Sequence, residues 1–256
     1  MKTKKFMKTT LLLLFIFFIS VSCSNGNSIV SAIAKGNVAL KATATINNTG
    51  AKIGAASKTN TTTGTTISSF KINIKNIEFH KKENEDSNTV SSDSIYEDTK
   101  LMGPFELDLA SGNTSIDVAT VDIPDNVYDK VKFELHKSKD TNSTIFGKSI
   151  EIKGDINGNP FVFWTDAEEE MAVKFNISSN TPVRGIVVTG TQTNTTTINF
   201  NLTTIFGPTS TIDFSTAVDG NGDGVIEISP DNVDGNADLA KTIKDMLEQE
   251  TDLEND

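Results

Sequence analysis

The stretch KSIEIKGDINGNPFVFW, residues 148–164, decides the fold class. Apolar and polar residues alternate on both sides of the dipeptide Asn157-Gly158. This alternation is typical of half-buried strands. Asn-Gly is the strongest short signal for a two-residue type I′ turn, because both turn residues need a positive φ. The stretch therefore predicts a β-hairpin.

The same two-residue period recurs through most of the chain, in the runs 37–46, 69–82, 104–112, 123–138, 170–177, 183–191, 196–206 and 210–218. About nine or ten short strands, with no helical period before residue 236, predict an all-β fold, an antiparallel sandwich or barrel. In the run 69–82 the apolar parity changes between Ile74 and Ile77. Such a change predicts a β-bulge near Lys75-Asn76.

Only near the C-terminus does the spacing of the apolar residues change, from the two-residue period of strands to the period of a helix. An apolar stripe at helical spacing consists of Leu239, Ile243, Met246 and Leu247. It predicts a short amphipathic α-helix that packs on the edge of the sandwich, with Asp234 or Asn236 as its cap. A helix that binds a partner is the alternative. We expect residues 251–256 to be frayed.

The N-terminus predicts export and a lipid anchor. Four lysines precede the apolar run 11–19, which has the length of a signal-peptide core and is too short to span a bilayer. Cys23, the only cysteine, follows Ser20-Val21-Ser22 and resembles the cysteine of a bacterial lipobox, although Ser20 stands where Leu is usual. The resemblance implies lipidation of Cys23 and therefore a membrane as partner. Ser24 in place of an Asp favours the outer membrane or cell surface.

These features divide the chain into four predicted parts. They are a signal peptide (1–22), a lipidated flexible tether (23–36), a β-sandwich domain (37–217), and an acidic turn with a helix (218–256). Removal of the signal peptide and its four lysines changes the net charge from −11 to −15. This charge argues against nucleic acid as a partner.

The order of the motifs resembles a group of bacterial lipoproteins with one transthyretin-like β-sandwich domain of unknown function. The matching features are an apolar-His pair at the end of a strand, Phe79-His80, and a proline-led turn from Pro124 to Tyr128. The resemblance covers roughly residues 37–206. It implies an antiparallel transthyretin-like sandwich and membrane anchoring, and it implies no enzymatic activity.

A calcium site is predicted in the acidic turn, at VDGNGDGVIEISPD, residues 218–231. Its spacing follows an EF-type loop, in which oxygen ligands stand at positions 1, 3, 5, 7 and 9 and a glycine at position 6. With the glycine at Gly224, the predicted ligands are Asp219, Asn221, Asp223, the Val225 carbonyl and Glu227.

The final ligand of this loop departs from the EF-type pattern. Position 12 is Pro230, so a loop one residue longer, closed by Asp231 or by Asp234, is needed to complete the shell. We expect a structural Ca²⁺ here. The alternative is an acidic turn that joins the last strand to the helix without an ion.

Catalytic motifs are not found in the sequence. His80 and His136 end similar strands and could be neighbours, but a joint metal site would need a third ligand, so two exposed strand-end histidines are the simpler interpretation. Glu168, Glu169 and Glu170 are adjacent, and neighbours in a strand point to opposite faces, which favours a solvated loop over an acid–base pair.

The prediction is therefore a non-catalytic surface module that binds an extracellular protein or glycan. The alternative is a structural subunit of a fimbria-like fibre. Fimbrial relatives are often matured by cleavage after an arginine near the first strand. The only arginine here, Arg184, lies deep in the chain and counts against that route.

Overall fold

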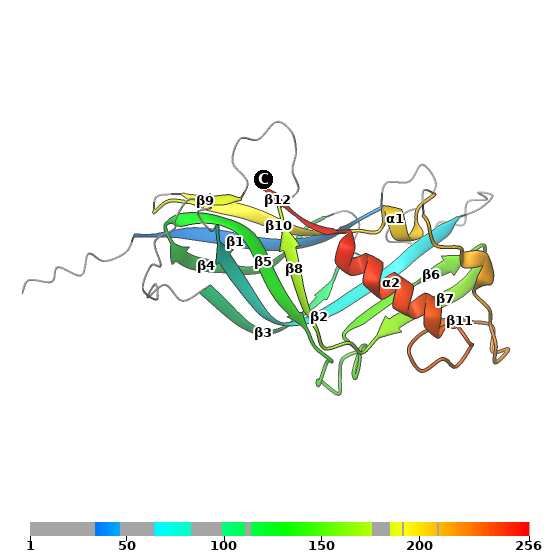
Figure 1. Cartoon of the computed structure of the whole chain (residues 1–256). Helices are drawn as coiled ribbons and strands as arrows, with labels where there is room; N and C mark the ends of the chain where they lie inside the picture. The colour runs from blue at the N-terminus through cyan, green and yellow to red at the C-terminus, as the bar shows by residue number, and fades with distance from the viewer. Residues whose placement is uncertain are drawn as a thin grey trace, which may run out of the picture. The chain divides into compact units, whose positions relative to one another are not determined.

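Strands make up most of the described chain, as the alternating pattern predicted (Figure 1). The computed structural model describes residues 34–46, 64–82, 99–110, 114–175, 185–190, 192–208 and 210–255. All of them lie in one compact unit, Ile33–Asp256. The predicted signal peptide and Cys23 lie outside the described residues.

In chain order the elements are β1 Lys35–Thr45, β2 Thr65–Lys81, β3 Thr99–Asp108, β4 Ile116–Pro124, β5 Asn126–Leu135, β6 Ile150–Ile156, β7 Asn159–Thr165, β8 Glu170–Lys174, β9 Ile186–Val188, β10 Thr193–Asn201, α1 Thr203–Phe206, the 3-10 turn η1 Phe214–Thr216, β11 Ile226–Ile228, α2 Ala237–Gln249 and β12 Thr251–Asn255.

The smaller of the two sheets has four strands in the order β12-β10-β1-β4. β1 pairs with β4 and β10 pairs with β12 in antiparallel register, whereas β1 and β10 run parallel. The N-terminal strand of the domain therefore lies between a strand from the middle of the chain and one from near its end.

The larger sheet is organised around β2, a strand of 17 residues. β3 covers one edge of β2, and β5 and β6 follow one another along the other edge. β9, β8 and β7 form the next row, because β9 and β8 pair with β5 and β7 pairs with β6. β11 then pairs with β7 in parallel.

The prediction of a purely antiparallel fold is wrong at two pairings, β1 with β10 and β7 with β11. A two-residue period records which side chains face the core, and it carries no information about strand direction. In both cases a long stretch of intervening chain lies between the two strands, which allows the second strand to enter the sheet from the same end as the first.

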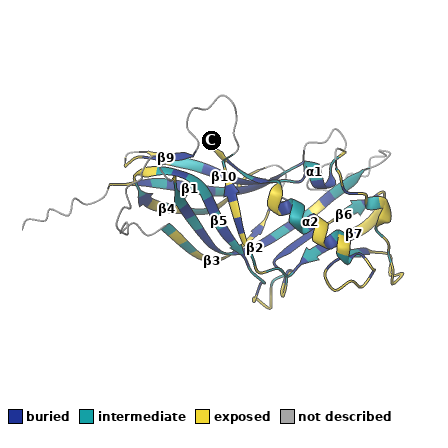
Figure 2. Ribbon diagram, in the orientation of Figure 1, coloured by how far each residue is buried: buried dark blue, intermediate teal, exposed yellow. Residues whose placement is uncertain are grey.

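One hydrophobic core fills the space between the two sheets (Figure 2). Phe200 of β10 meets two phenylalanines of the larger sheet edge to face, with its ring centroid 5.4 Å from that of Phe70 and 6.1 Å from that of Phe133. The two sheets also meet at one margin, where an isolated bridge joins Phe175 to Leu253.

Two local predictions are confirmed. Asn157 and Gly158 have φ values of 51° and 85°, and β6 pairs with β7 across this turn, as a type I′ hairpin requires. The register of β2 shifts between Ile74 and Asn76 against both β3 and β5. Against β5, Lys75 is the extra residue of a bulge. Against β3, the extra residue lies in β3, where Gly103 and Pro104 stand opposite Lys75. The bulge turns Ile74 and Ile77 towards the same core.

The C-terminal prediction is right for the helix and wrong for the residues after it. α2 buries Ile243 and Leu247 of the predicted apolar stripe, together with Ala240, and its Leu239 and Met246 are partly buried against the core. Residues 251–255, expected to be frayed, instead form β12 at the edge of the smaller sheet. Among the described helices none is long and apolar enough to cross a membrane.

Candidate calcium-binding loop and charged cleft

The acidic loop is organised around the carboxylate of Asp219. Its Oδ1 accepts hydrogen bonds from the backbone N–H groups of Gly222 and Asp223, at 2.7 and 3.1 Å. Its Oδ2 accepts from Gly224 N–H at 2.8 Å. One side chain therefore satisfies three consecutive backbone donors, which curls the chain around the position of the first predicted ligand.

The next two predicted ligands extend this arrangement. Asn221 Oδ1 accepts from the backbone of Asp223 at 2.8 Å, and Asp223 Oδ1 accepts from the backbone of Val225 at 2.9 Å. Gly222 and Gly224 have φ values of 75° and 90°, in the left-handed region that favours glycine. The alternation of oxygen-bearing residues with glycine is what allows a turn this tight.

Asp234 closes the loop from the C-terminal side. Its side chain is buried, and its two oxygens accept from Asn221 N–H at 3.1 Å and from Glu227 N–H at 2.6 Å. Asp231, by contrast, is exposed. Of the two carboxylates that the sequence offered for closure, Asp234 is therefore the one in contact with the loop.

Asn236 connects Val218 and Glu227, at the two ends of the loop, by hydrogen bonds. The sequence did not reveal this role. Asn236 is only 4% exposed. Its Nδ2 donates to the carbonyls of Val218 (2.7 Å) and Glu227 (2.8 Å), and its Oδ1 accepts from Val218 N–H at 3.2 Å. Asn236 is the N-cap residue of α2, one of the two predicted, but because its side chain is used in this way it makes no capping hydrogen bond. Asn232 Oδ1 accepts from Ala237 N–H instead.

The side chain of Glu227 also accepts hydrogen bonds from two residues outside the turn. Its Oε1 accepts from Trp164 Nε1 at 3.3 Å and from Ser229 Oγ at 2.8 Å. The only tryptophan of the chain therefore contacts one of the predicted calcium ligands, and the indole links the loop to β7.

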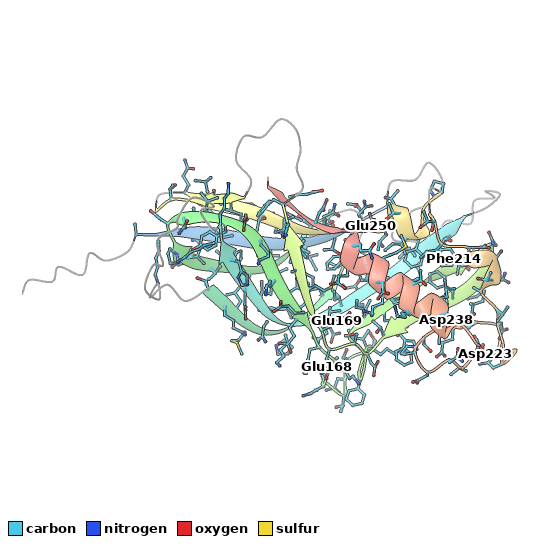
Figure 3. All side chains as sticks on the ribbon, in the orientation of Figure 1. Glu168, Glu169, Phe214, Asp223, Asp238 and Glu250 are labelled. Atoms are coloured by element: carbon cyan, nitrogen blue, oxygen red, sulfur yellow. The ribbon has the colours of Figure 1, made fainter. Side chains whose placement is uncertain are left out.

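The loop fits a calcium ion in part. Asp219, Asn221 and Asp223 have the spacing and the turn geometry of such a site, and Figure 3 shows Asp223 in the loop that precedes α2. Within the described residues, however, no three His, Cys, Asp or Glu side chains form a group ready to hold a metal ion. An ion would therefore draw the Glu227 carboxylate or further oxygens towards the turn.

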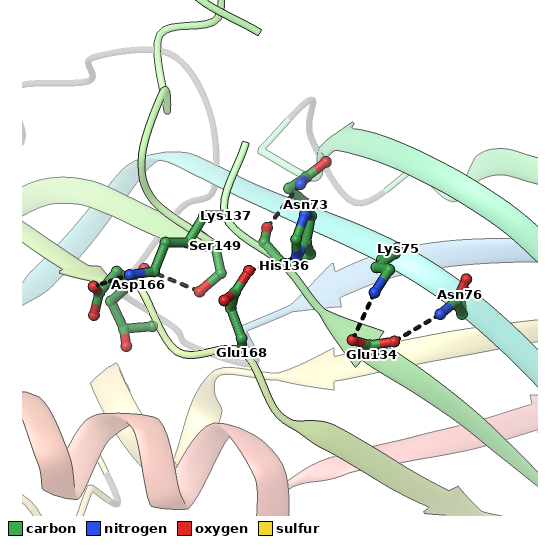
Figure 4. A network of polar contacts seen from close by, with 10 residues as sticks. Asn73, Lys75, Asn76, Glu134, His136, Lys137, Ser149, Asp166 and Glu168 are labelled. Carbon is green, nitrogen blue, oxygen red and sulfur yellow. Dashed lines mark hydrogen bonds and ion pairs between the residues drawn. The ribbon is translucent and has the colours of Figure 1, made fainter. Parts of the chain in front are cut away.

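A charged cleft of about 260 Å³ lies on the outer face of the larger sheet, next to the bulge in β2. It is lined by Asn76, Glu78, Lys100, Lys132, Phe133, Glu134, Glu168, Glu169 and Glu170. Figure 4 shows Lys75 and Asn76 reaching the same carboxylate, that of Glu134, at 3.2 and 2.6 Å. The bulge places these two consecutive residues beside one partner.

Three adjacent glutamates border this cleft, and each has a different partner. Glu168 Oε1 lies 2.6 Å from His136 Nδ1, Glu169 pairs with Lys244 of α2 at 2.6 Å, and Glu170 pairs with Lys132 of β5 at 2.7 Å. The prediction of a solvated loop is therefore incomplete, since the segment is tied to a strand and to a helix. These partners are distant in sequence, so no local signal could have revealed them.

The two histidines are far apart and mostly buried, with side-chain exposures of 18% for His80 and 16% for His136. His136 N–H donates to the carbonyl of Asn73, seven residues before His80 on the same strand. At about 3.3 Å per residue the separation is roughly 23 Å. The expectation of two exposed histidines is wrong, and a joint metal site is excluded by this separation.

Two carboxylates of the cleft, those of Glu78 and Glu134, have lowered pKa values because of their basic partners. A hydrogen bond from Lys100 lowers the pKa of Glu78. Hydrogen bonds from Lys75 and Asn76 lower the pKa of Glu134, against a smaller opposing effect of burial. A general acid needs a raised pKa, so these two groups are poorly suited to that role.

Glu151 is the most buried acidic residue of the outer face, at 2% exposure. Its two oxygens pair with Lys148 at 2.5 Å and Lys153 at 2.6 Å. Burial opposes its ionisation, but the hydrogen bonds from the two lysines together outweigh burial and lower its pKa. Lys148 also lies over the Trp164 ring, 5.4 Å from its centroid, so this network adjoins the one that contains Glu227.

Comparisons with known proteins yield no relative. No protein-family model matches the chain, and searches of curated proteins and of solved structures give no match either.

Proposed function

We propose that this chain is a lipid-anchored, non-catalytic binding module of the outer membrane or cell surface, with a structural Ca²⁺ in its C-terminal loop. The observation that carries the proposal is the Asp219 carboxylate, which gathers three backbone N–H groups at the position of the first EF-type ligand. The turn is held in a ligand-like shape by protein contacts alone, so an ion would find part of its shell in place.

The proposed calcium ligands are Asp219, Asn221, Asp223, the Val225 carbonyl and Glu227. Asp231, the sixth residue expected from the sequence, is exposed, and we propose Asp234 as the closing carboxylate in its place. A divalent ion offsets the repulsion between these carboxylates. Its role is structural, because Asp234 and Asn236 connect the loop to the start of α2.

We infer a transthyretin-like β-sandwich, supported by two sheets that share one core through Phe70, Phe133 and Phe200. Lipidation of Cys23 would leave this domain outside the bilayer, tethered by the residues after the cysteine. The ligand would be an extracellular protein or glycan.

Calorimetry and thermal melting with Ca²⁺ test the proposal, on the segment that begins at Ser24 and contains the whole compact unit Ile33–Asp256. The double variant Asp219→Ala, Asp223→Ala removes two proposed ligands. A matched control, Asp238→Ala with Glu248→Ala, removes the same charge from exposed positions of α2. We expect a calcium-dependent rise in Tm for the unmodified protein and the control only. No heat and no shift up to several mM would refute the calcium site.

A further inference from the structure

Among the described strands, β4 has a free edge that differs from the other strand edges. It ends the smaller sheet, pairing only with β1 among the described strands. β8 and β12 have five residues each, and β9 and β11 have three. β3 has ten, but Pro104 in its interior has no N–H to donate. β4 has nine residues and no proline before its last, so apart from the bulge at Val118 its free edge offers the longest row of backbone donors and acceptors among these edges.

Within the described part of the chain, several apolar residues beside this edge are only partly buried. The partly buried apolar residues of β3 and β4 that pack against the core are Leu101, Phe105, Ile116, Val118 and Val121. Figure 2 shows exposed and intermediate positions along β3. An added strand would cover apolar surface here as well as satisfy backbone groups.

The charge on the strand specifies the partner. Register with β1 places Asp117, Thr120 and Asp122 on the outer face of β4, and all three are exposed. No ion pair joins either carboxylate to a cation within the described residues, although Lys41 lies opposite Asp117. This contrasts with the glutamates of the charged cleft, which all have basic partners. The strand itself carries no lysine or arginine.

We propose that β4 is a docking edge for an extended segment of another protein in which apolar residues alternate with Lys or Arg. The apolar side chains of the segment would face Ile116 and Val121, and its basic side chains would face Asp117 and Asp122. Val118 is the extra residue of a bulge, so the two aspartates oppose positions i and i+4 of a regular strand. The inference rests on the proposed function, because it names the binding surface of that module.

Pairing with a second copy of β4 is disfavoured. In an antiparallel pair of β4 strands centred on Thr120, with Val118 as the extra residue of the bulge, Asp117 of one copy would lie opposite Asp122 of the other, at both ends of the pairing. Like charges directly opposite one another destabilise a strand pair. The same aspartates that attract a basic segment therefore act against self-association.

The test measures the binding of two nine-residue peptides to the segment from Ser24 onward. Isotope-edited NMR detects the binding. In the first peptide, valines alternate with polar residues, and lysines stand at positions 3 and 7. The second has glutamate at both positions. We expect the lysine peptide to bind at least about tenfold more tightly, since each cross-strand ion pair and each avoided repulsion contributes. The shifts should be confined to β4, β3 and their neighbours, and binding should weaken as salt rises.

A charge-reversed variant makes the test decisive. Asp117→Lys with Asp122→Lys should invert the preference, so that the glutamate peptide binds better. The control, Asp238→Lys with Glu248→Lys, makes the same change of net charge on α2 and should leave the preference unchanged. Equal binding of both peptides, shifts away from β4, or a dimer formed through β4 would overturn the inference. Calcium binding is scored separately on the same samples, so a failed docking edge does not count against the calcium loop.

Discussion

At the residue scale, Asn236 connects the two ends of the acidic loop. Its amide contacts both ends of the loop, at Val218 and at Glu227. Asn236→Ala would leave these buried backbone groups without partners, and we expect it to cost about 2 to 4 kcal/mol of unfolding free energy. Chemical denaturation measures this cost. Asn159→Ala, at an exposed position of β7, is the control, and equal effects of the two substitutions would contradict the role assigned to Asn236.

Glu151 gives the domain a component of acid sensitivity. Its pKa is lowered in the folded state, so it contributes stability above the ordinary pKa of a glutamate, and that contribution is lost as pH falls through the folded-state pKa. Glu151→Gln should therefore destabilise the protein at pH 7, by about 1 to 3 kcal/mol, and by less near pH 3. Denaturation at both pH values tests this. Glu248→Gln, on the exposed side of α2, should show no such pH dependence, and a difference of constant size for Glu151→Gln would refute the argument.

At the scale of elements, the hairpin shows what local chemistry can specify. Gly158 has φ of 85°, and a Cβ at this position would meet no atom within 4 Å. The cost of Gly158→Ala is therefore conformational and should be about 1 to 2 kcal/mol. Asn157→Gly keeps a residue suited to positive φ and should be nearly neutral. Thermal denaturation of the two variants distinguishes them, and a neutral Gly158→Ala would mean that the turn tolerates another geometry.

β12 shows what the local pattern missed. Its five residues carry only one large apolar side chain, Leu253, so the sequence predicted a frayed end. In the structure Leu253 is 2% exposed, and Thr196 and Asn199 of β10 bond to the backbone and side chain of Glu254. The stabilising partners belong to a strand more than fifty residues away, which no local period reveals.

Because residues 251–255 form a strand, changes in this segment should lower the stability of the domain. Leu253→Ala should destabilise the domain by about 2 to 5 kcal/mol, as expected for truncation of a buried leucine. Deletion of residues 251–256 should cost at least as much, because it also opens the edge of β10. Urea denaturation measures both. If the deletion left stability unchanged, the end of the chain would be frayed in solution, as the sequence alone suggested.

At the scale of the whole molecule, long-range pairing accounts for most of what sequence reasoning could not reach. The period-2 runs predicted strands, and the parity change at Lys75 predicted a bulge. Both features depend on residues that are neighbours in the chain. Other features depend on which distant segments the fold brings together. They are the parallel pairing of β1 with β10 and the contacts of Glu168, Glu169 and Glu170 with three distant partners. For the candidate calcium loop, the sequence predicted the local turn and offered Asp231 or Asp234 for closure, and the structure was needed to show that Asp234 contacts the loop.

The acidic loop is built into the whole domain, so calcium should stabilise the domain as one unit. β11 pairs with β7, and α2 packs against the core and continues into β12. For a dissociation constant of about 0.1 to 1 mM, 10 mM Ca²⁺ should raise the unfolding free energy by about 1.4 to 2.7 kcal/mol. Trp164, which donates to Glu227, reports on the loop by fluorescence, and circular dichroism reports on the sheets. The fluorescence and circular-dichroism signals should have the same denaturation midpoint as each other, both without calcium and with it. In Asp219→Ala, Asp223→Ala, added calcium should not shift this midpoint. A calcium-induced change in fluorescence with no change in the circular-dichroism midpoint would instead show that the loop and the sheets unfold independently.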